Sequence, residues 1–111
     1  LPESVRAALA DIRAEEEAEE QRAREEREAA RREERLARWR EAYGLSGAQV
    51  TQMRTWMIDS RAAREELERQ RDASGDREAY RRARAELRAN ETLSLREIFT
   101  PAQFQAWEER E

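Results

Sequence analysis

The stretch that decides the fold is Leu-Ser-Gly-Ala-Gln at residues 45–49, which recurs in related form as Phe-Thr-Pro-Ala-Gln at residues 99–103. In each copy a hydroxyl side chain stands three positions before a glutamine, which is the spacing of a capping box. In such a box the hydroxyl accepts a hydrogen bond from the backbone N–H of the glutamine, whose side chain reaches back to the N–H of the capping residue. We therefore expect one helix to begin at Ser46 and another at Thr100.

The residues around each copy agree with two helix starts. Leu45 and Phe99 precede the capping residues, and Val50 and Phe104 follow four positions after them. An apolar pair at these two positions is a hydrophobic staple, which fixes the direction in which the chain enters a helix. Pro101 stands at the first helical position, where the missing N–H costs nothing.

Working outward from the two copies, we predict four helical pieces. A charged helix covers residues 1–43 and ends at Gly44, and the segment 45–111 begins at the first copy. Within that segment one helix runs from Ser46 to about residue 73, a second from Asp76 to about residue 99, and a short last helix starts at the second copy. The fold class is therefore all-α, and the 111 residues form a single domain.

The connection Ser-Gly-Asp at residues 74–76 is so short that the two middle helices must be antiparallel neighbours. Folding the chain about Gly75 brings together positions whose numbers sum to about 150. The resulting partners match in chemistry, apolar with apolar and charge with opposite charge. Examples are Met53 with Ile98, Arg64 with Glu86, and Leu67 with Ala83.

The first helix has apolar residues only near its two ends. Val5, Leu9 and Ile12 recur at helical spacing near its start, whereas the middle is almost entirely Glu, Arg and Ala. Acid-before-base pairs four residues apart, such as Glu20 with Arg24, stabilise such a helix in water. The segment is either a solvated spacer or a coiled-coil arm that needs a partner.

Composition limits the functions that are possible. Charged residues make up 43% of the chain and the net charge is −4, so the private core is small and a dimer would supply further burial. The acidic balance argues against a nucleic-acid binder. The sequence shows no apolar run long enough for a membrane span and no signal peptide; because it begins at Leu1, we expect a processed product.

Catalysis and cofactor binding have no support in the residue types. The chain has no His and no Cys, and no pair of nucleophile and base is recognisable. No phosphate-binding loop can be built from the three glycines, Gly44, Gly47 and Gly75, and carboxylates and two methionines are a poor set for a transition metal. We expect no enzyme activity, no cofactor and no metal.

The repeated phrase resembles the LTxxQ motif of a family of bacterial periplasmic proteins that includes the Spy- and CpxP-type chaperones. The resemblance covers about residues 36–111, and the long charged segment before it is atypical. It implies an all-helical, cradle-shaped homodimer in the periplasm that binds unfolded or misfolded envelope proteins without ATP. The motif residues are Leu45, Ser46, Gln49, Phe99, Thr100 and Gln103.

One broad face of the hairpin is the predicted client-binding surface, because it combines guanidinium groups with apolar side chains. Its members are Arg54, Ile58, Arg61, Arg81, Arg84, Arg88 and Leu95. Glu65, Glu68 and Asp72 interrupt this face, and an ordinary solvated surface has a similar composition. Met53, Trp56 and Met57 are expected in the core instead.

Two other functions remain open. The same fold would serve a regulatory or adaptor protein that docks one partner in envelope-stress or metal-resistance signalling, since relatives in the family regulate or sense in this way. Alternatively, the first helix is the working part, a structural coiled-coil spacer that the hairpin anchors.

Overall fold

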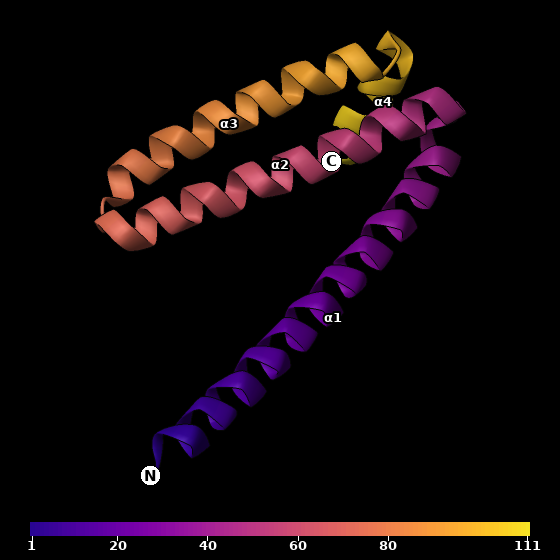
Figure 1. Ribbon diagram of the computed structural model, residues 1–111. Coiled ribbons are helices and arrows are strands. Elements are labelled where there is room, and N and C mark those ends of the chain that lie inside the picture. Colours follow the sequence, from indigo (N-terminus) through magenta and orange to yellow (C-terminus); the bar gives the residue numbers. More distant parts are fainter. The chain divides into compact units, whose positions relative to one another are not determined.

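The computed structural model describes all 111 residues and contains four helices and no strand. The helices are α1 (Glu3–Tyr43), α2 (Gly47–Ser74), α3 (Arg77–Ile98) and α4 (Pro101–Arg110) (Figure 1). The prediction of an all-α fold is confirmed. None of the four helices combines the length and the apolar character that a membrane span requires.

The helix ends lie within a residue or two of the predicted positions. Ser46, Asp76 and Thr100 are the N-caps of α2, α3 and α4, and each side chain accepts a hydrogen bond from the backbone. Gly44 and Gly75 have φ angles of 65° and 71°. This left-handed conformation ends a helix and is accessible to glycine without steric cost.

The chain divides into two compact units, residues 1–34 and residues 35–111. The first unit is helix α1 up to residue 34, and no side chain in it is buried. Val5, Leu9 and Ile12 expose 42%, 40% and 50% of their surface, so this apolar stripe has no cover within the chain. The long charged helix predicted for residues 1–43 is present, and its last turns belong to the second unit.

In the second unit α2 and α3 lie side by side and run in opposite directions (Figure 1). Trp56 donates its indole N–H to the carbonyl of Glu91 across the pair, at 3.1 Å. Near the turn, the guanidinium of Arg71 stands 4.6 Å from the ring centre of Tyr80. Both pairs have numbers that sum to about 150, the register expected for a fold about Gly75.

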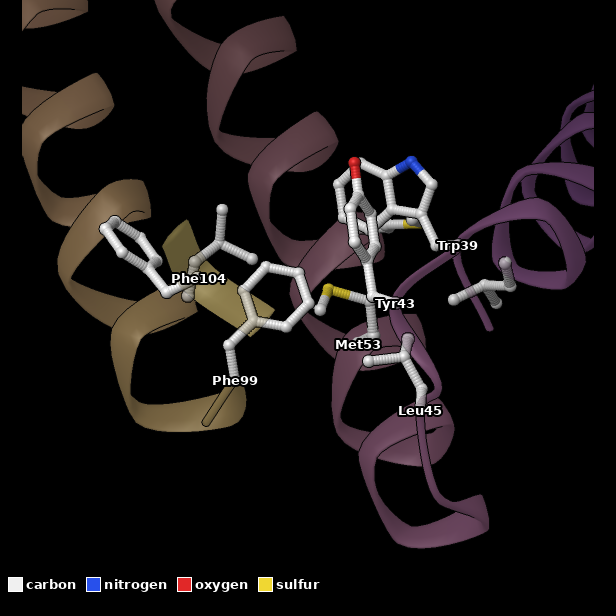
Figure 2. Close-up of a cluster of buried hydrophobic side chains, with 9 residues drawn as sticks. Trp39, Tyr43, Leu45, Met53, Phe99 and Phe104 are labelled. Atoms are coloured by element: carbon white, nitrogen blue, oxygen red, sulfur yellow. The ribbon is translucent and has the colours of Figure 1, made fainter. Parts of the chain in front are cut away.

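The apolar core lies at the end of the hairpin away from Gly75, where the last turns of α1 meet the two repeated phrases and α4. Met53 is fully buried among Tyr43, Leu45 and Phe99 (Figure 2). The buried apolar residues are Leu36, Trp39, Tyr43, Leu45, Met53, Met57, Leu95, Phe99 and Phe104. Ile98 and Trp56 pack against this cluster, so the core placement of Met53, Trp56 and Met57 is confirmed.

Aromatic rings hold the core together. The ring of Tyr43 lies 6.0 Å from that of Trp39 and 5.7 Å from that of Phe99, and Phe99 lies 6.4 Å from Trp107. Tilted and edge-on contacts at these distances add to the stabilisation that burial alone provides. The rings thus join the end of α1, the end of α3 and helix α4.

Candidate functional site

Both predicted capping boxes are present. Ser46 Oγ accepts from Gln49 N at 3.1 Å, and Ser46 N donates to Gln49 Oε1 at 2.9 Å. The corresponding distances for Thr100 and Gln103 are 3.2 Å and 2.9 Å. The two local predictions made from the repeated phrase are confirmed.

The structure also joins the two boxes, which the spacing alone did not predict. Gln49 Nε2 donates to Gln103 Oε1 at 2.6 Å, and Gln103 Nε2 approaches Gln49 Oε1 at 3.3 Å. We call this pair of side-chain amides the glutamine clasp. It connects residues that lie 54 positions apart in the chain.

Each glutamine of the clasp also reaches the backbone that precedes the other motif. Gln49 Nε2 donates to the carbonyl of Ile98 at 3.0 Å, and Gln103 Nε2 donates to the carbonyls of Tyr43 and Gly44 at 3.0 and 3.3 Å. Ile98 and Gly44 both stand two residues before a capping residue, so each glutamine reaches an equivalent position of the other motif. The clasp satisfies carbonyls at the ends of α1 and α3 that a helix leaves without an intrahelical partner.

Tyr43, whose carbonyl accepts from the clasp, has a phenol with a shifted pKa. Burial raises the pKa of its phenol, the nearby Glu111 carboxylate raises it further, and Arg110 partly offsets both effects. The phenol therefore keeps its proton to a higher pH than an exposed tyrosine does.

A second feature lies between α2, α3 and α4. Side chains from all three helices surround a depression of about 180 Å³, which we call the arginine groove. Its lining residues are Trp56, Arg64, Arg84, Arg88, Glu91, Thr92, Leu95 and Trp107. Two of the three tryptophans of the chain thus face three guanidinium groups in one place.

The arginine groove has excess positive charge, because Glu91 is the one carboxylate among its lining residues. Arg64 donates from Nε to the carbonyl of Ser60 at 3.3 Å, so the ion pair expected with Glu86 does not form. Neither Arg84 nor Arg88 forms an ion pair with a carboxylate of the chain. The guanidinium groups of the groove are therefore available to an external anion.

The wall of the groove also carries an unsatisfied donor. Trp107 Nε1 is buried and has no hydrogen-bond acceptor in the chain. A buried N–H without an acceptor costs about 1 to 3 kcal/mol, so this donor is a local cost to the stability of the second unit.

The structure separates the seven residues predicted to bind clients. Arg84 and Arg88 line the arginine groove, Arg81 is exposed on the same helix, and Ile58 exposes 44% of its surface on α2. Arg61 forms an ion pair with Glu65 at 2.9 Å. Arg54 on α2 is partly exposed.

Leu95 was placed wrongly on the exposed surface. It is only 1% exposed and belongs to the core. Its position on α3 follows the same helical face as Arg84 and Arg88, but near the end of α3 that face is covered because α4 folds back against it. Leu95 is among the lining residues of the groove, but it is too deeply buried to act as an exposed contact.

Three groove residues were not predicted as part of a binding site: Arg64, Trp56 and Trp107. Trp56 was expected only in the core, and Arg64 was assigned to the hairpin contact. The available signal was the large apolar residue four positions after each motif glutamine, which in the second copy is Trp107.

Comparison of the chain with known protein families, with curated proteins and with solved structures finds no match. The function must therefore be argued from the site itself.

Proposed function

We propose that this protein is an ATP-independent chaperone, a holdase that forms a homodimer and binds unfolded or misfolded proteins of the bacterial envelope. The observation that carries the proposal is the arginine groove, where unpaired guanidinium groups stand beside two tryptophan rings. The doubled capping motif supports it through its resemblance to the LTxxQ chaperones, from which the periplasmic location also follows.

The groove has the properties that weak capture of an unfolded chain requires. Guanidinium groups attract acidic segments over distances near the Debye length of about 8 to 10 Å. The partly exposed rings of Trp56 and Trp107 then offer apolar contact area to the captured chain. Because each interaction is weak and shallow, release needs no nucleotide.

Aggregation of a chemically denatured acidic protein tests the proposal. We expect the chain to suppress light scattering at near-stoichiometric ratio, and about 0.5 M salt to weaken this suppression because exposed charges are then screened. The double variant Arg84→Gln, Arg88→Gln should require several-fold more protein for the same effect.

The matched control is Arg77→Gln, Arg82→Gln, which removes the same charge from the same helix at exposed positions outside the groove. It should behave like the unmodified protein. No suppression at any ratio, or equal loss in both double variants, would contradict the proposal.

A second candidate function rests on the exposed stripe of Val5, Leu9 and Ile12. An uncovered apolar face on a solvated helix suits an adaptor that docks one envelope signalling partner, or a coiled-coil spacer. Affinity capture distinguishes the adaptor from the chaperone. An adaptor should capture one dominant protein, which is lost in the variant Leu9→Ser, whereas a chaperone should capture many proteins.

A further inference from the structure

We propose that the arginine groove of one copy binds residues 14–21 of a second copy, which we call the acidic segment. The homodimer would contain two such contacts, one in each direction. The inference deepens the dimer of the proposed function by naming the surfaces that meet. Its own test is the mass of the assembly, so it stands or falls separately from chaperone activity.

The acidic segment is the most one-sided stretch of charge in the chain. Between Arg13 and Arg22 there are five glutamates and no arginine. The segment is helical throughout and every residue in it is exposed. Its carboxylates therefore project from a preformed rod, so docking orders little additional chain.

Charge and spacing of the two surfaces are complementary. Residues 1–34 carry twelve acids and seven arginines, a net charge of −5, whereas the groove presents three arginines and one glutamate. Glu16 and Glu20 are four residues apart on one helix, as are Arg84 and Arg88 on the other. Both pairs therefore have the same rise of about 6 Å, and two helices lying side by side can match them.

Two effects make the contact stronger than one surface ion pair. Exposed pairs contribute little individually, so several must form together. Trp56 and Trp107 supply apolar walls beside the guanidinium groups, where the methylene groups of glutamate side chains can pack. In a twofold dimer each copy gives a segment and receives one, which doubles the contact.

The docked segment would compete with acidic clients, because Arg84 and Arg88 belong to both contacts. The segment would then act as a resident occupant that a longer unfolded chain displaces. High salt would weaken both contacts.

A charge exchange between copies tests the inference. The groove variant is Arg84→Glu, Arg88→Glu, and the segment variant is Glu16→Arg, Glu20→Arg. Each variant alone places like charges at both contacts, whereas an equimolar mixture pairs every altered surface with its opposite. Sedimentation velocity at low salt should find a dimer for the unmodified chain, a dissociation constant raised at least tenfold for each variant alone, and a heterodimer in the mixture.

Far-UV circular dichroism of each variant verifies that the helices are intact, since all four positions lie on helix surfaces outside the core. A groove or segment variant that dimerises as well as the unmodified chain would overturn the inference. So would a mixture that remains monomeric, which would exclude a contact made between copies.

The aggregation assay on the same proteins separates the two proposals. If the groove variant loses client capture while its mass matches that of the unmodified chain, the chaperone proposal stands and the docking inference fails. If exchange of charges restores the dimer but no protein suppresses aggregation, the docking inference stands and the chaperone proposal fails.

Discussion

Gln103 contacts more separate parts of the chain than any other polar side chain near the core. Its amide reaches the carbonyls of Tyr43 and Gly44, the amide of Gln49 and the backbone N–H of Thr100. Gln103→Leu keeps the size of the side chain but removes all these bonds. We expect a loss of about 2 kcal/mol in the free energy of unfolding, measured by urea denaturation.

Gln105→Leu is the control, because Gln105 is exposed on the same helix. Its effect should be within about 0.5 kcal/mol of zero. In a double-mutant cycle with Gln49→Leu, the two clasp substitutions should together cost less than the sum of their separate effects, because each removes the same shared bonds. Strict additivity would show that the amides do not interact in solution.

Tyr43 gives the molecule a pH dependence at the alkaline end. The pKa of its phenol is raised in the folded state above the ordinary value of 10.0, so above that pH the unfolded chain releases the proton first. Stability should therefore be unaffected by this group below pH 10 and should fall as the pH rises towards the folded pKa. Tyr43→Phe should show a smaller fall between about pH 9.5 and pH 11.5 in denaturant titrations.

Parallel curves for the unmodified protein and Tyr43→Phe would show that burial does not perturb the phenol. Absorbance of tyrosinate during a pH titration provides an independent reading of the same ionisation.

At the scale of single residues, local chemistry was predictable and distant partners were not. The capping boxes follow from a hydroxyl and a glutamine three positions apart, a spacing that specifies geometry within one helical turn. The bond between Gln49 and Gln103 depends on how α4 returns to the hairpin, and no local pattern encodes that return.

At the scale of helices, we predict opposite effects for alanine substitutions of the glycines at the two ends of α2. Gly75 ends α2 with a φ of 71°, where any side chain is strained, whereas Gly47 begins it and an added Cβ would meet nothing within 4 Å. Gly75→Ala should lower the free energy of unfolding by about 1 kcal/mol or more. Gly47→Ala should raise it by about 0.4 to 1 kcal/mol, because it restricts the unfolded chain.

Thermal denaturation of the two glycine variants measures this contrast directly. A stabilised Gly75→Ala protein would mean that the turn is not left-handed in solution.

Helix boundaries were predicted well because a glycine or a capping residue marks the end of α1, both ends of α2 and the starts of α3 and α4. The sequence also predicted that Arg84, Arg88 and Leu95 share one face of α3. It did not predict that this face is buried at Leu95. A projection of α3 alone cannot show that α4 covers the last turn, so Leu95 was assigned to the surface although it is buried.

For the whole molecule, the division into two units predicts unequal roles in stability. Every buried residue, including Ser60, lies in residues 35–111. Removal of residues 1–34 should reduce the far-UV helical signal but move the thermal midpoint of tryptophan fluorescence by less than about 4 °C. A fragment 35–111 that fails to fold would show that the first unit contributes to the core.

The glutamine clasp also determines how the second unit would respond to a pulling force. The second unit begins at residue 35 and ends at residue 111, and both ends belong to segments that the clasp joins. The turn at Gly75 lies at the opposite end of α2 and α3. Tension applied between those ends would load the clasp together with the aromatic contacts that join the same segments, and would leave the paired helices outside the load path. The clasp and these contacts would therefore rupture as an initial step, and the hairpin would separate only in a later extension event.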